Sequence, residues 1–240
     1  MEWRDEGVLL AVRPLGEGKA ILEILTAAHG RLAGVAPGGA SRRMAPLLQP
    51  GAQLAAVWRA RVDAHIGTWT VEPLRSRAAA LLSDRRAGTA MGAVAALAVA
   101  FLPEREPCPG FYALTLDLVE ALGREADWPE RYARWEFALL AELGYGLDLG
   151  DCAVTGATED LAWVSPRTGR AVSRGAAGAW EDRLLPLPRL FLGEGGNGDP
   201  ADLAAALRLT GHFLDRRLAP AHGLAGLPEA RGRLVRLLAG

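Results

Sequence analysis

The chain contains very little cysteine and almost no lysine. Cys108 and Cys152 are the only cysteines in 240 residues. Two cysteines cannot form a disulfide framework, and the charged N-terminal residues do not look like a secretory signal. Lys19 is the only lysine among 27 basic residues. We interpret the excess of arginine over lysine as a result of genomic base composition. Any chemistry that requires a lysine side chain would have to use Lys19.

The sequence also lacks a long hydrophobic run and an excess of charge of one sign. Its formal net charge of −1 excludes a basic coat over the whole chain, although a local basic patch stays possible. The apolar run over 88–102 is shorter than the roughly 20 residues of a membrane span, so we expect a buried helix there. We expect no membrane segment and a cytoplasmic protein. The 50% of hydrophobic residues excludes disorder over most of the chain.

The first 75 residues have the pattern of short strands. Apolar runs separated by turn residues predict five strands, before any helix. They cover residues 7–13, 20–26, 31–36, 51–62 and 66–71. Five β-strands in so short a segment predict a small barrel. The five-stranded OB-fold is one such barrel, and it commonly binds single-stranded nucleic acid.

A long loop over 37–50 separates two of these strands, and it carries Arg42 and Arg43 beside two glycines. Long loops between barrel strands often carry function. Residues 1–80 hold ten basic and seven acidic side chains, whereas residues 81–150 hold six and eleven. This charge asymmetry predicts a first domain over 1–78 and a second domain over 79–240.

The second domain has mainly helical patterning. Leucine spacing, proline breaks and capping residues predict several helices. They cover residues 75–86, 88–102, 110–122, 128–143, 199–218 and 228–238. The helical period is lost over about 146–178, where glycine, threonine, serine and proline gather. The fold class predicted is therefore α+β: an OB-fold barrel, then a mainly helical domain with an irregular insertion.

Catalytic motifs are missing from the sequence. None of the four histidines belongs to an H-E-x-x-H motif, there is no G-x-S-x-G elbow, and the segment around Lys19 lacks the first glycine of a phosphate loop. Residues 193–198 match G-x-G-x-x-G, but no clear strand precedes them, so we interpret them as a linker. We find no convergent ionisable groups and expect a protein without enzymatic activity.

Aromatic and basic residues alternate in the strand region. Trp3, Trp58 and Trp69 stand in strand-like segments near Lys19, Arg59 and Arg61. One interpretation is that aromatic rings stack bases while the cations contact phosphates. The other is that the tryptophans fill the barrel core, as large aromatic side chains mostly do. The sequence leaves both open.

A resemblance to a known family rests on residues 143–191, which read LGYGLDLGDCAVTGATEDLAWVSPRTGRAVSRGAAGAWEDRLLPLPRLF. This stretch resembles the C-terminal half of RecO, a family of bacterial DNA-repair mediators. The N-terminal strands and the Gly/Arg loop over 38–43 agree with the family in order and spacing. The resemblance therefore covers nearly the whole chain.

The resemblance implies an N-terminal OB-fold and a helical domain with a small insertion. It also implies binding of single- and double-stranded DNA, annealing of complementary strands and, with RecR, loading of RecA onto DNA coated by single-stranded DNA-binding protein. The acidic C-terminal tail of that coating protein is a further expected partner. The expected location is the cytoplasm, next to the nucleoid. The alternative is a non-catalytic scaffold that docks a partner peptide on its helical domain.

The sequence departs from the family at its metal site. Many members carry two C-x-x-C pairs in the insertion and bind zinc, but here the first pair has Cys152 followed by Thr155, and residues 170–176 contain no Cys or His. A structural zinc site needs four ligands. We therefore predict a zinc-finger-like insertion without zinc, and no cofactor. We expect packing among Leu147, Leu161, Trp163 and Val172 to hold it, with Cys152 as a small core residue.

The family resemblance places DNA contacts at the basic loop. Arg42 and Arg43 match this loop, and Lys19, Arg59 and Arg61 are neighbouring candidates in the strand region. Arg216 and Arg217, at the end of the helix over 199–218, are further candidates for a basic surface. The pocket for the partner tail is expected in the helical domain, where arginine should accompany apolar walls, but the sequence does not name its residues.

Overall fold

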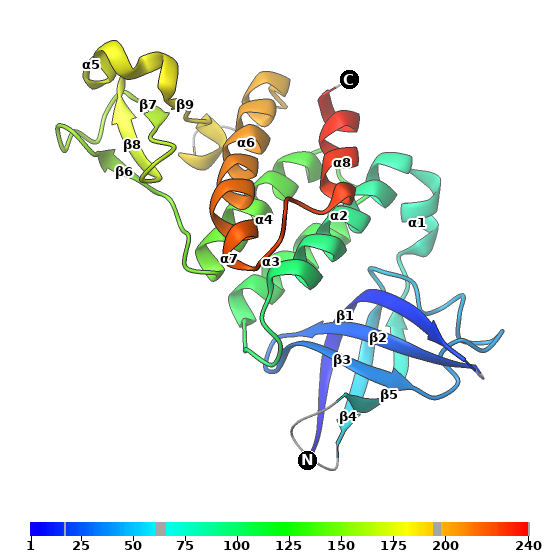
Figure 1. Cartoon of the computed structure of the whole chain (residues 1–240). Coiled ribbons are helices and arrows are strands. Elements are labelled where there is room, and N and C mark those ends of the chain that lie inside the picture. Colours follow the sequence, from blue (N-terminus) through cyan, green and yellow to red (C-terminus); the bar gives the residue numbers. More distant parts are fainter. Residues whose placement is uncertain (17, 61–65, 194–197, 240) are drawn as a thin grey trace. The chain divides into compact units, whose positions relative to one another are not determined.

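The structure is a computed structural model that describes residues 1–16, 18–60, 66–193 and 198–239 (Figure 1). The chain divides into two compact units. Unit 1 consists of Met1–Glu125 and Pro228–Leu234, and unit 2 consists of Ala126–Leu227 and Val235–Gly240. This division does not test the boundary predicted after residue 78, which stays a prediction.

Unit 1 begins with a closed β-barrel. Its strands are β1 (Glu2–Leu15), β2 (Lys19–Thr26), β3 (Gly30–Ala36), β4 (Gln53–Arg59) and β5 (Gly67–Arg75). Their order around the barrel is β1-β2-β3-β5-β4 (Figure 1). Every pairing is antiparallel except that of β3 with β5, which is parallel and joins Gly34 to Gly67 and Val35 to Thr68. The predicted five-stranded barrel is confirmed.

Strand β1 pairs with two neighbouring strands. Its first half pairs with β4, from Glu2 opposite Arg59 to Val8 opposite Gln53. Its second half pairs with β2, and a bulge between Leu9 and Ala11 shifts the register. The strand predicted from the sequence begins only at Gly7, because the five residues before it are mostly charged. In the structure, every second residue of this segment is exposed, namely Glu2, Arg4 and Glu6. Their charged side chains therefore lie on the outer face of the barrel.

The barrel core contains two of the three tryptophans. Trp58 and Trp69 are each 1% exposed and pack among small and branched apolar residues of all five strands. The core interpretation is therefore right for both. Trp3 lies half-buried at the edge of this cluster. The two rings fit because their closest strand neighbours are glycines: a Cβ on Gly67 would stand 2.2 Å from Cε2 of Trp58.

Three helices of unit 1 follow the barrel in sequence: α1 (Ala78–Ser83), α2 (Arg85–Phe101) and α3 (Pro109–Ala121). The single helix predicted over 75–86 is wrong. Arg75 is the last residue of β5, and Asp84 separates α1 from α2 in an extended conformation. The Asp84 carboxylate accepts a hydrogen bond from the Arg86 amide at 2.8 Å, so it caps the start of α2.

Unit 2 is built around α4 (Trp128–Glu142) and α6 (Pro200–Phe213), which pack together. The buried Glu136 on α4 accepts a hydrogen bond from the Thr210 hydroxyl on α6 at 2.5 Å. A π-helical segment, η3 (Leu214–Leu218), and α7 (Ala219–Ala221) continue α6. The last helix, α8 (Glu229–Ala239), has residues in both units. In the part of the chain that the structure describes, no helix has the length and apolar character needed to cross a membrane.

The insertion is a four-stranded sheet. Its strands follow the order β6 (Asp148–Cys152), β8 (Arg170–Ser173), β7 (Leu161–Val164) and β9 (Leu185–Pro186). The sequence pattern did not reveal these strands, because they are too short to establish an alternation. After β8 come α5 (Arg174–Ala177), η1 (Gly178–Arg183) and η2 (Arg189–Phe191).

The small core of this sheet agrees with three of the four packing residues predicted. Leu161, Trp163 and Val172 pack with the buried Cys152 and Ala177. Leu147 lies outside this cluster, half-buried before β6, where its Cδ2 atom lies next to Gly169 in the turn before β8. The prediction that Leu147 helps to hold the insertion stays a prediction.

Candidate nucleic-acid interface

The loop over 37–50 is a series of turns anchored to the barrel. The Ala40 amide donates to the Gly18 carbonyl at 3.0 Å, which ties the loop to the turn between β1 and β2. The Met44 amide donates to the Ser41 carbonyl at 3.1 Å, and Leu48 is buried in the barrel core. The loop therefore presents its exposed residues on a defined backbone.

Three predicted cations share this end of the barrel. Arg42 and Arg43 are exposed between Ser41 and Met44, and Lys19 is exposed at the start of β2, beside the Gly18 carbonyl that holds the loop. We call Lys19, Arg42 and Arg43 the basic loop surface. All three side chains are exposed, so an anionic ligand can reach them.

Arg59 differs from these three because it already has an anionic partner. Its guanidinium donates to the Glu2 carboxylate at 2.7 Å across the β1–β4 pairing, and both side chains are exposed. This hydrogen bond raises the pKa of Arg59 and lowers the pKa of Glu2. A phosphate would have to compete with Glu2 for this cation. Arg61, the other candidate beyond β4, lies outside the residues that the structure describes, and both residues stay predictions.

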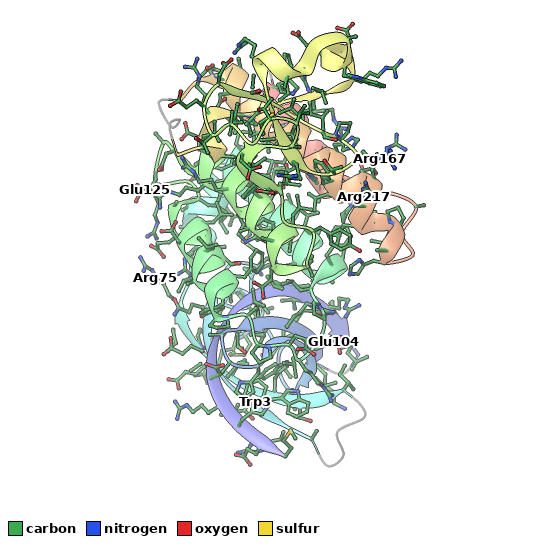
Figure 2. All side chains as sticks on the ribbon, turned by 90° about the vertical axis from the view of Figure 1, so that its left-hand side faces the viewer. Trp3, Arg75, Glu104, Glu125, Arg167 and Arg217 are labelled. Atoms are coloured by element: carbon green, nitrogen blue, oxygen red, sulfur yellow. The ribbon has the colours of Figure 1, made fainter. Side chains whose placement is uncertain are left out.

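Arg216 and Arg217 belong to unit 2, in the π-helical segment η3. Arg217 donates to the Arg167 carbonyl, and the two residues lie close together in Figure 2. Arg216 is 74% exposed at its side chain and lies 3.6 Å from the carboxylate of its neighbour Asp215. Arg217 therefore helps to hold the turn before β8, whereas Arg216 faces solvent. A DNA contact at either residue stays a prediction.

A second feature of unit 1 is an aromatic pocket at the edge of the barrel, with a volume of about 350 Å³. The pocket lies next to the start of β1, and Trp3 is labelled there in Figure 2. The rings of Trp3 and His29 are stacked, with centroids 3.8 Å apart and planes within 3°. We call this the Trp3 pocket; it is lined chiefly by Met1, Trp3, His29, Leu32, Trp58 and Arg105.

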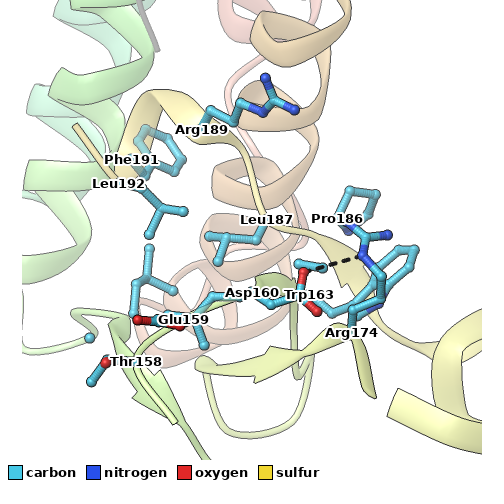
Figure 3. A pocket seen from close by; sticks show the side chains of 14 residues that line it. Thr158, Glu159, Asp160, Trp163, Arg174, Pro186, Leu187, Arg189, Phe191 and Leu192 are labelled. Atoms are coloured by element: carbon cyan, nitrogen blue, oxygen red, sulfur yellow. Dashed lines mark hydrogen bonds and ion pairs between the residues drawn. The ribbon is translucent and has the colours of Figure 1, made fainter. Parts of the chain in front are cut away.

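Unit 2 contains a larger pocket of about 980 Å³ between the sheet and the chain around η2. Figure 3 shows Leu187, Phe191 and Leu192 on its apolar side and the two arginines, Arg174 and Arg189, at its border. Arg174 donates to the Asp160 carboxylate at 3.3 Å. The amides of Arg189 and Leu190 both donate to Asp202 at 2.8 Å, which fixes η2. We call this the η2 pocket.

Cys152 stands where the family resemblance implies the first zinc ligand. Its sulfur accepts hydrogen bonds from the Ser173 amide at 3.2 Å and the Ser173 hydroxyl at 3.4 Å. Burial raises the pKa of this thiol, but hydrogen bonds from Ser173 and Thr155 outweigh burial and lower it to about 6. Among the described residues, no group of three or more His, Cys, Asp or Glu side chains is arranged so that it could hold a metal ion. One sulfur and two hydroxyls do not fit a structural zinc ion.

The sequence pattern did not identify His29 and Arg105 as functional residues. One interpretation made Trp3 and Trp58 stacking residues, but nothing in the sequence linked them to a histidine in the β2–β3 turn or to an arginine after α2. The only local signal was the Ala28-His29-Gly30 turn, because turns at barrel ends often carry binding residues. The G-x-G-x-x-G string interpreted as a linker has its four central residues outside the described part of the chain.

Comparison with known proteins gives matches over both halves of the chain. The family model described as "Recombination protein O N terminal" matches residues 1–77, and the one described as "Recombination protein O C terminal" matches residues 82–224. A protein of Cereibacter sphaeroides named "DNA repair protein RecO" is 57% identical over 239 residues, covering 100% of this chain and 99% of the relative. Proteins with that name from Dinoroseobacter shibae and a Ruegeria species are 56% and 54% identical, with at least 98% of each relative covered.

Proposed function

Because the chain belongs to the RecO family of DNA repair proteins, we propose that it binds single- and double-stranded DNA and anneals complementary strands. The observation that carries this proposal is the basic loop surface. Lys19, Arg42 and Arg43 are exposed on a loop that turns and buried Leu48 hold in place. Cations on a fixed backbone suit contacts with phosphates, which position a nucleic acid without reading its sequence.

Annealing follows from the same chemistry. Two complementary strands repel each other through their phosphates, and a protein that neutralises part of this charge brings them together. Contacts to phosphates leave the base edges free to pair. No chemical step on the DNA is needed, and we propose that the protein has no enzymatic activity.

The partners that we propose follow the family. With RecR, the protein would help to load RecA onto DNA coated by single-stranded DNA-binding protein, in the cytoplasm next to the nucleoid. We also propose that it works without zinc, because the surroundings of Cys152 lack a four-ligand donor set. Metal analysis of the purified protein tests this last point.

The double substitution Arg42→Ala with Arg43→Ala tests the basic loop surface. We expect weaker binding of both DNA forms, and the slope of log affinity against log salt should become shallower by about 1.5 to 2, because two phosphate contacts are lost. Fluorescence anisotropy over a range of salt concentrations measures the slope. Annealing of two complementary labelled oligonucleotides should slow down in the same buffer.

The matched control is Arg85→Ala with Arg86→Ala, an adjacent and exposed arginine pair at the start of α2. It removes the same charge outside the proposed surface, and its salt slope should stay close to that of the unsubstituted protein. If the two double variants reduce the slope equally, overall charge and not the loop determines binding, and the assignment of the loop is wrong.

A second candidate function, docking of a partner peptide, is favoured by the η2 pocket. Leu187, Phe191 and Leu192 suit the apolar side chains of a peptide, and Arg189 suits an acidic one. Arg174 already donates to Asp160 at 3.3 Å, so an acidic peptide would have to compete with that carboxylate. The acidic C-terminal tail of single-stranded DNA-binding protein is the occupant that we propose. Docking and DNA binding are compatible, because they use different residues.

We expect Arg174→Glu with Arg189→Glu to weaken binding of a synthetic tail peptide about tenfold. Both arginines border the pocket, and reversing their charge repels an acidic ligand. Calorimetry of the peptide with each variant measures the effect. Arg183→Glu, which changes an exposed arginine over the Trp180 ring outside the pocket lining, is the control and should bind the peptide normally. Equal affinities for all three proteins would exclude the η2 pocket.

A further inference from the structure

The Trp3 pocket has walls that its surroundings hold in place. The His29 imidazole stacks on Trp3, and its Nδ1 lies 3.1 Å from the Asp5 carboxylate. The His29 amide also donates to the Thr26 hydroxyl at 3.1 Å. On the other side, Trp58 lies 5.9 Å from Trp3 between ring centroids, with planes within 18°. The walls are therefore preorganised before any ligand arrives. Because Trp58 is 1% exposed, the aromatic surface open to a ligand belongs to the partly exposed Trp3 and His29.

The cation of this pocket comes from a residue with an unusual backbone. Arg105 has φ of +64°, a left-handed conformation that a side chain other than glycine rarely adopts. Its amide donates to the Arg31 carbonyl at 3.0 Å, and the Arg31 guanidinium donates to the Leu102 carbonyl at 3.0 Å. These contacts tie the segment after α2 to β3. As a result, the Arg105 guanidinium lies 5.4 Å from the centre of the Trp58 ring, within cation–π range.

We propose that the Trp3 pocket accepts one unpaired base of a single DNA strand, with Arg105 beside the adjoining phosphate. This inference rests on the proposed DNA binding and adds a selection for unpaired bases to it. Aromatic rings stack any base, whatever the sequence. A cavity of about 350 Å³ is within the usual range for small ligands. In a duplex the bases are stacked inside, so the pocket has no base to accept.

The surroundings favour a base over a bare phosphate or a metal ion. Aromatic and aliphatic side chains dominate the lining, and the carboxylate next to it, Asp5, would repel a phosphate placed against His29. The competing occupant is an apolar side chain of a partner peptide, which would use the same walls but would not need Arg105.

The test compares three probes: a short oligothymidine, an abasic strand of the same length and a duplex. An abasic strand keeps the phosphates and removes the bases. We expect the unsubstituted protein to bind oligothymidine about tenfold more tightly than the abasic strand. Trp3→Leu should remove most of this difference and leave the affinities for the abasic strand and the duplex unchanged. Arg105→Asn removes the proposed phosphate contact, so it should weaken binding of oligothymidine and of the abasic strand and leave the affinity for the duplex unchanged.

Arg105→Asn keeps the fold comparable, because asparagine tolerates a left-handed backbone. Its midpoint of unfolding should fall only slightly, because the cation–π contact with Trp58 is lost, so the loss of affinity for the single strands would not come from unfolding. Arg85→Ala is the control for a lost positive charge. Quenching of tryptophan fluorescence by oligothymidine, but not by the abasic strand, is a second readout that Trp3→Leu should reduce.

The outcomes separate the two proposals. If the protein binds DNA but Trp3→Leu retains the full preference for oligothymidine, the Trp3 pocket does not take a base, and only the DNA contact at the basic loop surface is left as a proposal. If the variants weaken binding of the tail peptide instead, the occupant is an apolar side chain and the inference is wrong. If no probe binds at low salt, DNA binding itself fails, and this inference fails with it.

Discussion

Gly67→Ala is expected to destabilise the protein by about 3 kcal/mol or more, at the upper end of the range for overpacked cores. The new methyl group would stand 2.2 Å from Cε2 and 2.3 Å from Nε1 of Trp58, a rigid ring that is 1% exposed. Neither side can yield easily, because Gly67 pairs with Gly34 where β3 and β5 close the barrel. Chemical denaturation followed by circular dichroism measures the loss.

Two further variants make this prediction specific. Gly92→Ala, on α2 with no atom within 4 Å of the new methyl group, should be neutral or stabilise by up to about 1 kcal/mol. Trp58→Phe should recover part of the loss when combined with Gly67→Ala, because a smaller ring leaves room for the methyl group. Equal stability of Gly67→Ala and the unsubstituted protein would mean that the strand shifts without cost.

Glu23→Ala is expected to cost about 3 to 5 kcal/mol, the range for removing one partner of a buried ion pair. The Glu23 side chain is 5% exposed and accepts hydrogen bonds from Arg31 at 2.7 Å and from Arg13 at 2.8 Å. The Arg31 side chain is 11% exposed, so without Glu23 its charge stays largely buried and keeps only the Leu102 carbonyl and the half-exposed Glu104 carboxylate, at 3.5 Å, as partners. Thermal and denaturant unfolding measure the difference.

Double-mutant cycles should give unequal coupling energies for Glu23 with its two arginine partners. Coupling of Glu23 with Arg13, which is 62% exposed, should be below about 1 kcal/mol, as for a solvent-screened pair. Coupling with Arg31 should be several times larger. Glu23→Leu combined with Arg31→Met should be less harmful than Glu23→Ala alone, because no buried charge is left unpaired. If Arg13 proves to be the stronger partner, burial is not what makes this pair important.

The sequence predicted secondary structure correctly where the alternation of apolar and polar residues extends over several positions. Strand β3 alternates buried and half-buried residues over its whole length, and the predicted strand over 31–36 differs from it by one residue. The pattern fails where tertiary pairing overrides it. Residues 2–6 are mostly charged, yet they form half of β1 because β4 lies beside them. Arg75 has helical neighbours in sequence but is the last residue of β5.

The candidate sites show the same limit. Arg42 and Arg43 were recognisable because two adjacent arginines in a glycine-containing loop are a local signal. The Trp3 pocket was not, because Trp3, His29 and Arg105 come from a strand, a turn and an interhelical segment that only the folded barrel brings together. The partner that neutralises Arg59 is hidden for the same reason, since Glu2 is close to it only through the β1–β4 register.

The double pairing of β1 has a consequence for the order in which the barrel forms during synthesis. Strands β1, β2 and β3 are joined by short turns, so the half of β1 that faces β2 finds its partner soon after translation. The other half, from Glu2 to Val8, has to wait for β4, which begins at Gln53. Until then Trp3 lacks its neighbour Trp58. The Trp3 pocket is therefore a late product of folding, and a nascent chain without β4 has the histidine turn but no complete pocket.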